Sequence, residues 1–309
     1  MILSCYTSFR KQVLGLKASV ETHILRILLV CILLLVGLIL WVNLSPHLSG
    51  TTSVDVQSES YVIMRFEDGE VLSSKEKDAQ IYPASMTKMM TAILAIEKYE
   101  DLEEVIEVPY SIFPALYAQD ASRAGFEPGE RVPYRDILYG ILLPSGCECC
   151  ETAAYLTAGS EETFVEWMNE KAASLGMDHT HFANATGLHD SNHYTTTYDL
   201  ALLLRYCLQN ETFYEVFTTS SYLTTPSNIH PEGMILRSTM REELSDISTG
   251  DVEILGGKTG FTSLAGLCLA SLGEVNGERY IVVNAGAPGD HSTEPYHILD
   301  AITLYQSLS

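Results

Sequence analysis

The chain has 309 residues, 46% of them hydrophobic, and it carries 40 acidic against 18 basic residues. This acidic balance excludes a nucleic-acid-binding protein, because affinity for nucleic acids comes largely from Lys and Arg contacts with phosphates. The hydrophobic fraction excludes a disordered chain, and about 250 residues beyond the N-terminal region suffice for one large domain or two small ones.

Residues 27–42 form an uninterrupted apolar run, which predicts a transmembrane signal anchor over 27–44. Four basic residues and one acidic residue precede the run, so residues 1–26 are predicted to form a cytoplasmic tail. The acidic remainder is then expected on the extracytoplasmic face of the cell membrane, held there by a single span. A cleaved signal peptide is the alternative, but the run is long for one and no typical cleavage site follows it.

A Ser- and Thr-rich linker is predicted over 45–60 and one folded domain over 61–309. Two hairpins are predicted at turns containing Asp-Gly and Asn-Gly, with strands over 61–66, 71–72, 267–272 and 280–285. Apolar periodicity predicts helices over 84–99, 134–143, 148–156, 161–175, 197–208 and 294–308. Strands at both chain ends favour an α/β chain of the α+β type: an antiparallel sheet flanked by helices, with an all-helical subdomain.

The Ser-x-x-Lys pattern occurs at Ser8, Ser74 and Ser85. Ser8 lies in the predicted tail and Ser74 in a polar turn, whereas Ser85 opens the apolar helix predicted over 84–99. Lys88 then lies one turn later on the same helix face. A lysine in an apolar site loses its proton more readily, so it can act as a base for the serine hydroxyl. A helix-capping serine beside a solvated lysine is the structural alternative.

Two later motifs can complete a site around Ser85. Ser145 stands in a Pro-Ser-Gly turn between two predicted helices, and a Lys-Thr-Gly sequence at 258–260 stands just ahead of the strand predicted over 267–272. They supply a second hydroxyl, a second cation and a small residue that lets a substrate backbone approach. A phosphate-binding P-loop is excluded, because Val252 stands where that motif requires its first glycine.

Cysteines and histidines offer weaker alternatives. Five of the seven cysteines lie in the domain, so at least one thiol is unpaired within the monomer. The Cys-Glu-Cys-Cys cluster at 147–150 lacks a second ligand pair at zinc-binding spacing, and Cys207 and Cys268 are predicted to be buried in apolar runs. Histidines also gather near Asp190 and offer possible metal ligands, namely His179, His181, His189 and His193.

In this order, the three motifs resemble those of the active-site-serine penicillin-recognising enzymes. Four longer stretches resemble the low-molecular-mass D-alanyl-D-alanine carboxypeptidases: residues 82–97, 127–146, 164–208 and 256–271. The resemblance covers nearly all of residues 60–309. It implies a β-lactamase/transpeptidase-like fold and a substrate that is the D-Ala-D-Ala end of peptidoglycan stem peptides. It also implies β-lactam antibiotics as covalent inhibitors, no metal or other cofactor, and a polar family loop where the histidines lie.

Carried over by position, the resemblance assigns the chemical steps to three side chains. Ser85 would be the nucleophile and Lys88 its general base, and Ser145 would relay a proton to the leaving amine. Water would then hydrolyse the acyl-enzyme.

The resemblance also assigns the binding groups. Lys258 and Thr259 would hold the terminal carboxylate of the substrate, while Gly260 lets its backbone approach. The N–H groups of Ser85 and Phe261 would form the oxyanion hole. One position departs from the family, because Cys147 replaces the asparagine of its Ser-x-Asn motif. A thiol is a weaker donor than an amide, and this loss would cost roughly 1–3 kcal/mol of transition-state stabilisation.

Three functions are compatible with these residues. The first is a membrane-anchored D-Ala-D-Ala carboxypeptidase. The second is a catalytically weakened peptidoglycan-binding homologue, which the replacement at Cys147 suggests. The third is a related β-lactamase or esterase, although no additional deacylating glutamate is assignable from the sequence.

Overall fold

A computed structural model of the protein describes residues 29, 32 and 54–309. The predicted tail, most of the predicted anchor and the first residues of the predicted linker lie outside the described residues. None of the described helices is both long and apolar enough to cross a membrane. The anchor over 27–44 therefore stays a prediction.

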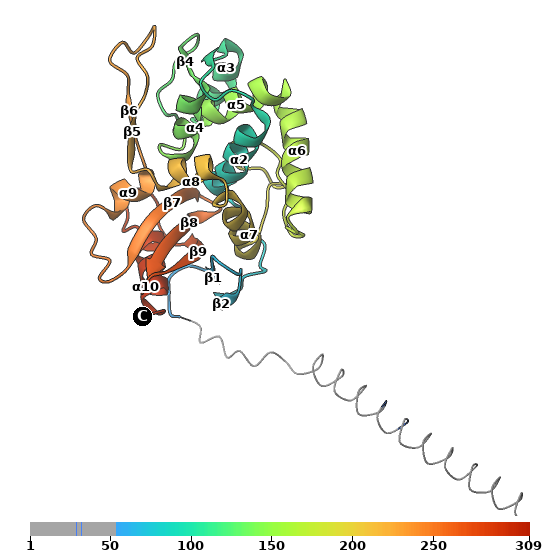
Figure 1. The fold of residues 1–309 in the computed structure, drawn as a ribbon, viewed down its shortest axis with the longest axis vertical. Coiled ribbons are helices and arrows are strands. Elements are labelled where there is room, and N and C mark those ends of the chain that lie inside the picture. The colour runs from blue at the N-terminus through green and yellow to red at the C-terminus, as the bar shows by residue number, and fades with distance from the viewer. Residues whose placement is uncertain (1–28, 30–31, 33–53) are drawn as a thin grey trace, which may run out of the picture. The chain divides into compact units, whose positions relative to one another are not determined.

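From residue 54 onward the chain is organised around a five-stranded antiparallel sheet in the order β2-β1-β9-β8-β7 (Figure 1). Its strands are β1 (Ser60–Arg65), β2 (Val71–Lys75), β7 (Glu253–Thr262), β8 (Gly266–Val275) and β9 (Glu278–Ala287). Because β1 pairs with β9, the two ends of the chain meet inside one sheet. The predicted sheet and both predicted hairpins are confirmed.

The sheet has an apolar core on each face, because side chains alternate along its strands. In β1, Val62 and Met64 join the larger core, whereas Tyr61 and Ile63 join the smaller one. Helix α10 (Tyr296–Gln306) covers the smaller core.

The last residues of the predicted linker pack against the sheet region. Ser58 is fully buried, and its N–H and its hydroxyl each donate to Asp300 Oδ2 at 2.6 Å. Strand β1 begins at Ser60. The packed part of the chain therefore begins before residue 61.

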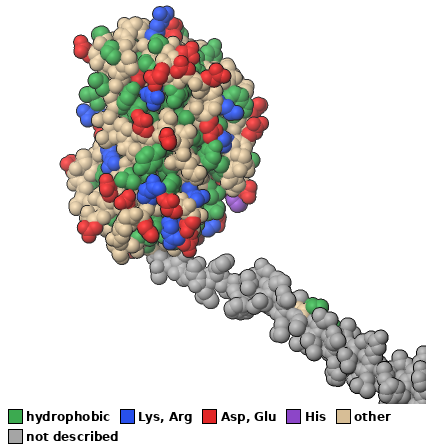
Figure 2. All heavy atoms as spheres, viewed as in Figure 1, with side chains coloured by type: hydrophobic (Ala, Val, Ile, Leu, Met, Phe, Trp, Pro, Cys, Tyr) green, Lys and Arg blue, Asp and Glu red, His purple; other side chains and the backbone are tan. Residues whose placement is uncertain are grey.

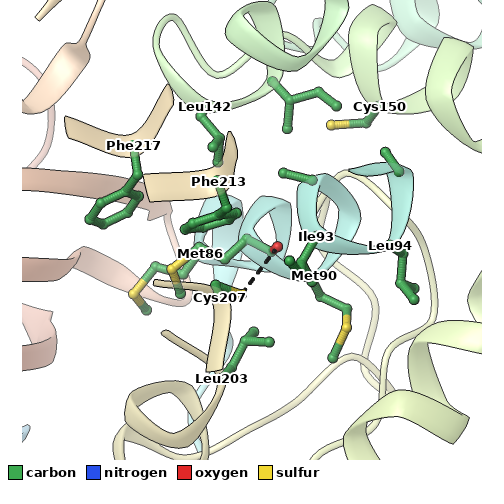
Figure 3. Packing of buried hydrophobic residues seen from close by; sticks show 14 of the residues in the cluster. Met86, Met90, Ile93, Leu94, Leu142, Cys150, Leu203, Cys207, Phe213 and Phe217 are labelled. Atoms are coloured by element: carbon green, nitrogen blue, oxygen red, sulfur yellow. Dashed lines mark hydrogen bonds between the residues drawn. The ribbon is translucent and has the colours of Figure 1, made fainter. Parts of the chain in front are cut away.

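The larger core lies among helices. Its central helix is α2 (Lys88–Lys98), and Figure 3 shows Met90 and Ile93 of that helix near Leu203 and Phe213. The helices that share this core are α4 (Tyr134–Leu142), α5 (Cys147–Ala158), α6 (Glu161–Ser174), α7 (Thr197–Cys207) and α8 (Glu211–Thr218). Four of these match predicted helices, and α8 was not predicted.

Further short elements complete the described chain. They are η1 (Ala84–Thr87), β3 (Val105–Glu107), η2 (Tyr110–Ile112), α3 (Phe113–Ala118), β4 (Arg131–Pro133), β5 (Ser221–Leu223), β6 (Ile235–Arg237) and α9 (Thr239–Leu244). On the face seen in Figure 2, acidic side chains are interspersed with basic and apolar ones. That face shows no continuous basic stripe, which agrees with the composition.

Candidate active site

Ser85 lies in η1, a 3-10 turn that leads directly into α2. The helix predicted over 84–99 is therefore wrong at its start, because the α-helix begins at Lys88. Pro83 precedes the turn, and Ala84 has a φ of 46°, a left-handed value that a right-handed α-helix does not accommodate. The turn nevertheless brings Ser85 Oγ within 2.9 Å of Lys88 Nζ, as the Ser-x-x-Lys spacing requires.

Lys88 is completely buried, and its ammonium group has three hydrogen-bond partners. Besides Ser85 Oγ, Nζ donates to the carbonyl oxygen of Thr186 at 2.7 Å and to Cys147 Sγ at 3.5 Å. These partners match the three hydrogens of a protonated lysine. Cys147 thus lies beside the Ser85–Lys88 pair.

Two features of the surroundings of Lys88 shift its pKa in opposite directions. Burial lowers the pKa of Lys88, but negative charge on Cys147 and Cys150 raises it, and the net result is a pKa above the usual lysine value. A general base must be deprotonated before it can accept a proton. Burial raises the pKa of the Cys150 thiol well above its usual value, so its thiolate charge is absent near neutral pH.

Ser145 lies in the turn between α4 and α5 with a φ of 66°. Ser122 Oγ donates to its carbonyl oxygen at 2.8 Å, which holds the turn. Lys258 Nζ donates to Ser145 Oγ at 2.9 Å and to the carbonyl oxygen of Thr259 at 2.9 Å. A second Ser–Lys pair therefore faces the first, and both lysines are buried.

Lys258 belongs to strand β7, for which no element was predicted. Three glycines lower the β-propensity of this strand, so the sequence does not predict it. Each glycine allows another part of the chain to approach the strand closely. A Cβ at Gly260 would lie 3.2 Å from Ser85 N and 3.2 Å from the carbonyl oxygen of Pro83. Strand β7 thus runs directly alongside the turn that carries Ser85.

A cavity of about 240 Å³ opens over these groups. Thr259 and Thr239 meet in its wall, with their hydroxyl oxygens 2.6 Å apart. The lining residues are Ser85, Ser122, Pro144, Ser145, Thr239, Glu242, Glu243, Thr259, Gly260, Phe261, Leu267, His291 and His297. The structure therefore brings all the predicted site residues to one cleft, either in its wall or, for Lys88, Cys147 and Lys258, bonded to the residues of that wall.

Replacing Lys258 by methionine is expected to change how stability depends on pH. Burial, followed by the charge of Lys88, lowers the pKa of Lys258 from 10.5 to about 7. Between these values the Lys258 side chain binds more protons in the unfolded chain than in the folded chain, so its contribution to stability rises with pH. Urea unfolding should therefore show the wild type gaining stability relative to the variant from pH 7 toward pH 10.5. A constant difference between the two proteins would contradict this titration.

Replacing Gly187 by alanine is expected to disturb the turn that carries Ser85. Gly187 has a φ of 81°, and a Cβ there would collide with the carbonyl oxygen of Ala84. The matched control is Gly159→Ala, which has a φ of 82° but no atom within 4 Å of the added Cβ. Backbone strain costs about 1–3 kcal/mol of stability in either variant. Only Gly187→Ala should lose more stability than this, because only its Cβ meets the turn that carries Ser85. Equal thermal shifts for the two variants would refute the collision.

The other Ser-x-x-Lys patterns form no comparable pair among the described residues. Ser74 lies in β2, and Lys77 pairs with Asp78 at 2.6 Å. Ser8 lies outside the described residues. The prediction that Cys207 and Cys268 are buried is confirmed, since both are fully enclosed.

Two of the four histidines predicted as possible metal ligands, His181 and His193, have side-chain contacts with other parts of the protein. His193 is buried, with Nε2 2.8 Å from Thr87 Oγ1 and with Nδ1 accepting from Ala183 N at 3.1 Å. Burial lowers its pKa to about 4, so the ring is neutral near pH 7. His181 Nδ1 lies 2.6 Å from the carbonyl oxygen of Asn192. In the part of the chain that the structure describes, no cluster of these residue types is arranged to hold a metal ion.

A family model for D-alanyl-D-alanine carboxypeptidases, peptidase family S11, matches residues 47–289. The chain belongs to this family. Among the relatives of this S11 peptidase, D-alanyl-D-alanine carboxypeptidase DacF of Bacillus subtilis is 30% identical over 261 residues, which are 83% of this chain and 65% of DacF. DacA of Escherichia coli is 30% identical over 168 residues, 52% of this chain and 41% of DacA. The chain thus spans less than two thirds of the length of these relatives.

Solved structures agree with the family. A variant of the Streptomyces K15 DD-transpeptidase in which one serine is replaced by alanine aligns with a TM-score of 0.74 and 25% identity. The alignment covers 82% of this chain and 99% of that chain. A D-alanyl-D-alanine carboxypeptidase from Mycobacterium tuberculosis shares the fold with a TM-score of 0.71 and 23% identity, covering 84% and 93%. Other variants of the Streptomyces enzyme alter a serine and a cysteine two positions apart, which is the spacing of Ser145 and Cys147.

Proposed function

We propose that this S11 peptidase is a serine D-Ala-D-Ala carboxypeptidase that removes the terminal D-alanine of peptidoglycan stem peptides. The observation that carries the proposal is the pair of hydrogen-bonded Ser–Lys couples at one cleft, with Ser85–Lys88 and Ser145–Lys258 each 2.9 Å apart. Family membership supports the same reaction.

The geometry supports a two-step acyl transfer. Ser85 Oγ attacks the carbonyl carbon of the last peptide bond while Lys88 takes its proton, and the N–H groups of Ser85 and Phe261 stabilise the oxyanion. The amine of the departing D-alanine receives a proton through Ser145. Water then cleaves the ester, which frees the shortened peptide and restores the hydroxyl of Ser85. β-Lactams would acylate the same serine.

The proposed location of the reaction follows from the N-terminal sequence. We place the protein in the cell membrane, with residues 27–44 as a single span and the peptidase domain on the extracytoplasmic face. Peptidoglycan lies on that side of the membrane. Fractionation of cells and protease accessibility of the domain in intact spheroplasts test this arrangement, and a domain that resists protease until lysis would argue against it.

The reaction is tested by incubating the full chain with an N-acylated peptide that ends in D-Ala-D-Ala. We expect release of one D-alanine per turnover, and no release when the peptide ends in L-Ala-L-Ala. Stoichiometric penicillin labelling without release of D-alanine would favour the catalytically weakened homologue instead. Rapid hydrolysis of penicillin would favour a β-lactamase.

Transpeptidation is a second candidate, because the Streptomyces DD-transpeptidase has a serine and a cysteine at the same spacing. In that reaction an amine replaces water. It attacks the ester carbonyl, the C–O bond to Ser85 breaks, an amide forms, and the proton of the amine returns to the serine oxygen. Adding an amine acceptor to the peptide reaction and measuring amide product against free acid separates the two activities.

Cys147→Asn tests the cost of the unusual motif. The amide is a stronger hydrogen-bond donor and acceptor than the thiol that it replaces beside Lys88. We expect kcat/KM for D-alanine release to rise roughly five- to a hundredfold, in line with one recovered hydrogen bond. Cys149→Ala, which changes a buried cysteine of the same helix, is the control. Lower activity in Cys147→Asn would show that the thiol is part of an adapted site.

A further inference from the structure

The cleft contains charged and titratable side chains that no step of the proposed reaction uses. Glu242 and Glu243 on α9 line the cleft, and so do His291 and His297. Among the cleft-lining residues that the structure describes, none is Lys or Arg. Within the described cleft, positive charge can therefore come only from these histidines or from the two buried lysines.

A substrate that ends in a carboxylate needs a positive partner in this cleft, because the protein carries a formal charge of -22 and its field repels anions. Lys258 meets that need only in part. It is fully buried and already bonded to Ser145 Oγ and to the carbonyl oxygen of Thr259. With a pKa of about 7, it is also only partly charged at neutral pH.

His297 is placed to supply the missing charge. Its side chain is 2% exposed, and Nε2 lies 2.9 Å from Glu243 Oε2, an ion-pair contact when the ring is protonated. Within the described part of the chain, neither Glu243 Oε2 nor Nδ1 of this ring has a hydrogen-bond partner. A buried nitrogen without a partner is costly, so the unpaired Nδ1 points to a ligand that completes the site.

We propose that His297, as an imidazolium held by Glu243, binds the terminal carboxylate of the substrate together with Thr259. The protonated ring pairs with the charge of Glu243 at Nε2 and offers the N–H at Nδ1 to a second anion. This inference rests on the proposed function, because it assigns a specificity residue for the same reaction.

His291 is the other histidine of the cleft, but its surroundings differ. Its side chain is exposed, and its ring packs edge-on against Phe261 with centroids 4.9 Å apart. Water screens a charge on an exposed ring, whereas a charge on an enclosed ring acts through a medium of lower dielectric constant. Replacing His297 and replacing His291 are therefore expected to have different effects on the preference for a carboxylate.

The test compares two peptides that differ only at the end: an N-acylated D-Ala-D-Ala acid and its C-terminal amide. The ratio of their kcat/KM values is measured for the wild type and for His297→Gln. We expect the wild type to favour the acid, and the variant to lose about tenfold or more of that preference, mainly through KM of the acid. The matched control is His230→Gln, which breaks another His–Glu pair, 2.8 Å long, that does not line this cleft.

Each other outcome overturns the inference. A wild-type enzyme with no preference for the acid contradicts it without any variant, even if His297→Gln does not fold. An equal loss toward acid and amide in His297→Gln assigns the ring a purely structural role. Loss of the preference in His291→Gln alone moves the carboxylate site to the exposed ring. If the wild type cleaves neither peptide, it is the proposed function itself that fails.

Discussion

Ser85→Ala is expected to abolish the release of D-alanine and the covalent reaction with penicillin. Ser85 Oγ is the hydroxyl bonded to Lys88 Nζ at 2.9 Å in the cleft, and its removal leaves Lys88 without a hydroxyl partner. Loss of a catalytic serine lowers kcat by roughly a thousandfold or more in enzymes of this kind of chemistry. The measurement is D-alanine release from the D-Ala-D-Ala peptide, alongside gel detection of bound fluorescent penicillin.

Ser74→Ala is the matched control, because it alters a second Ser-x-x-Lys pattern in β2 that does not line the cleft. It should retain wild-type activity and labelling. If Ser85→Ala still bound penicillin covalently, or if Ser74→Ala lost labelling while remaining folded, the nucleophile would be assigned to the wrong serine.

Lys88→Gln is expected to slow acylation by about 10²–10⁴-fold, which is the usual contribution of a positioned general base. Glutamine keeps a hydrogen-bonding group near Ser85 and the carbonyl oxygen of Thr186 but cannot take up a proton. The rate of penicillin acylation, followed by stopped-flow fluorescence, measures this step without the complication of deacylation.

Lys77→Gln provides the control for the loss of a lysine, since Lys77 pairs with Asp78 away from the cleft. Its acylation rate should match that of the wild type. An unchanged acylation rate in folded Lys88→Gln would mean that the Ser145–Lys258 couple activates the serine instead.

Most helices and strands of the fold were predictable because each contains a turn motif or an apolar periodicity within its own sequence. The Asn276-Gly277 turn has φ values of 54° and 80°, as a two-residue hairpin requires, and the strands on either side follow from it. Helices α4 to α7 follow from apolar periodicity. Strand β7 was missed because glycines at 256, 257 and 260 weaken a strand signal, and their purpose is visible only in contacts with distant parts of the chain.

The sequence predicted the motif residues of the site, but it did not predict the residues that hold them in place. Ser85 and Lys88 are close in sequence, and the family resemblance joined them to Ser145 and Lys258. The partners contributed by remote loops and helices carry no motif of their own: Thr186 through a carbonyl oxygen, Ser122 and Thr239 through hydroxyls, and His297 through its buried ring. Backbone partners in particular are independent of side-chain identity, so no sequence pattern announces them.

The central claim is that the reaction passes through an acyl-enzyme on Ser85. It is tested most directly by quenching the turnover of an N-acylated D-Ala-D-Ala peptide with acid and mapping the bound acyl group by mass spectrometry. We predict that the peptide, shortened by one D-alanine, is attached to the fragment that contains Ser85. Release of D-alanine with the acyl group on Cys147, or on no residue, would contradict the account.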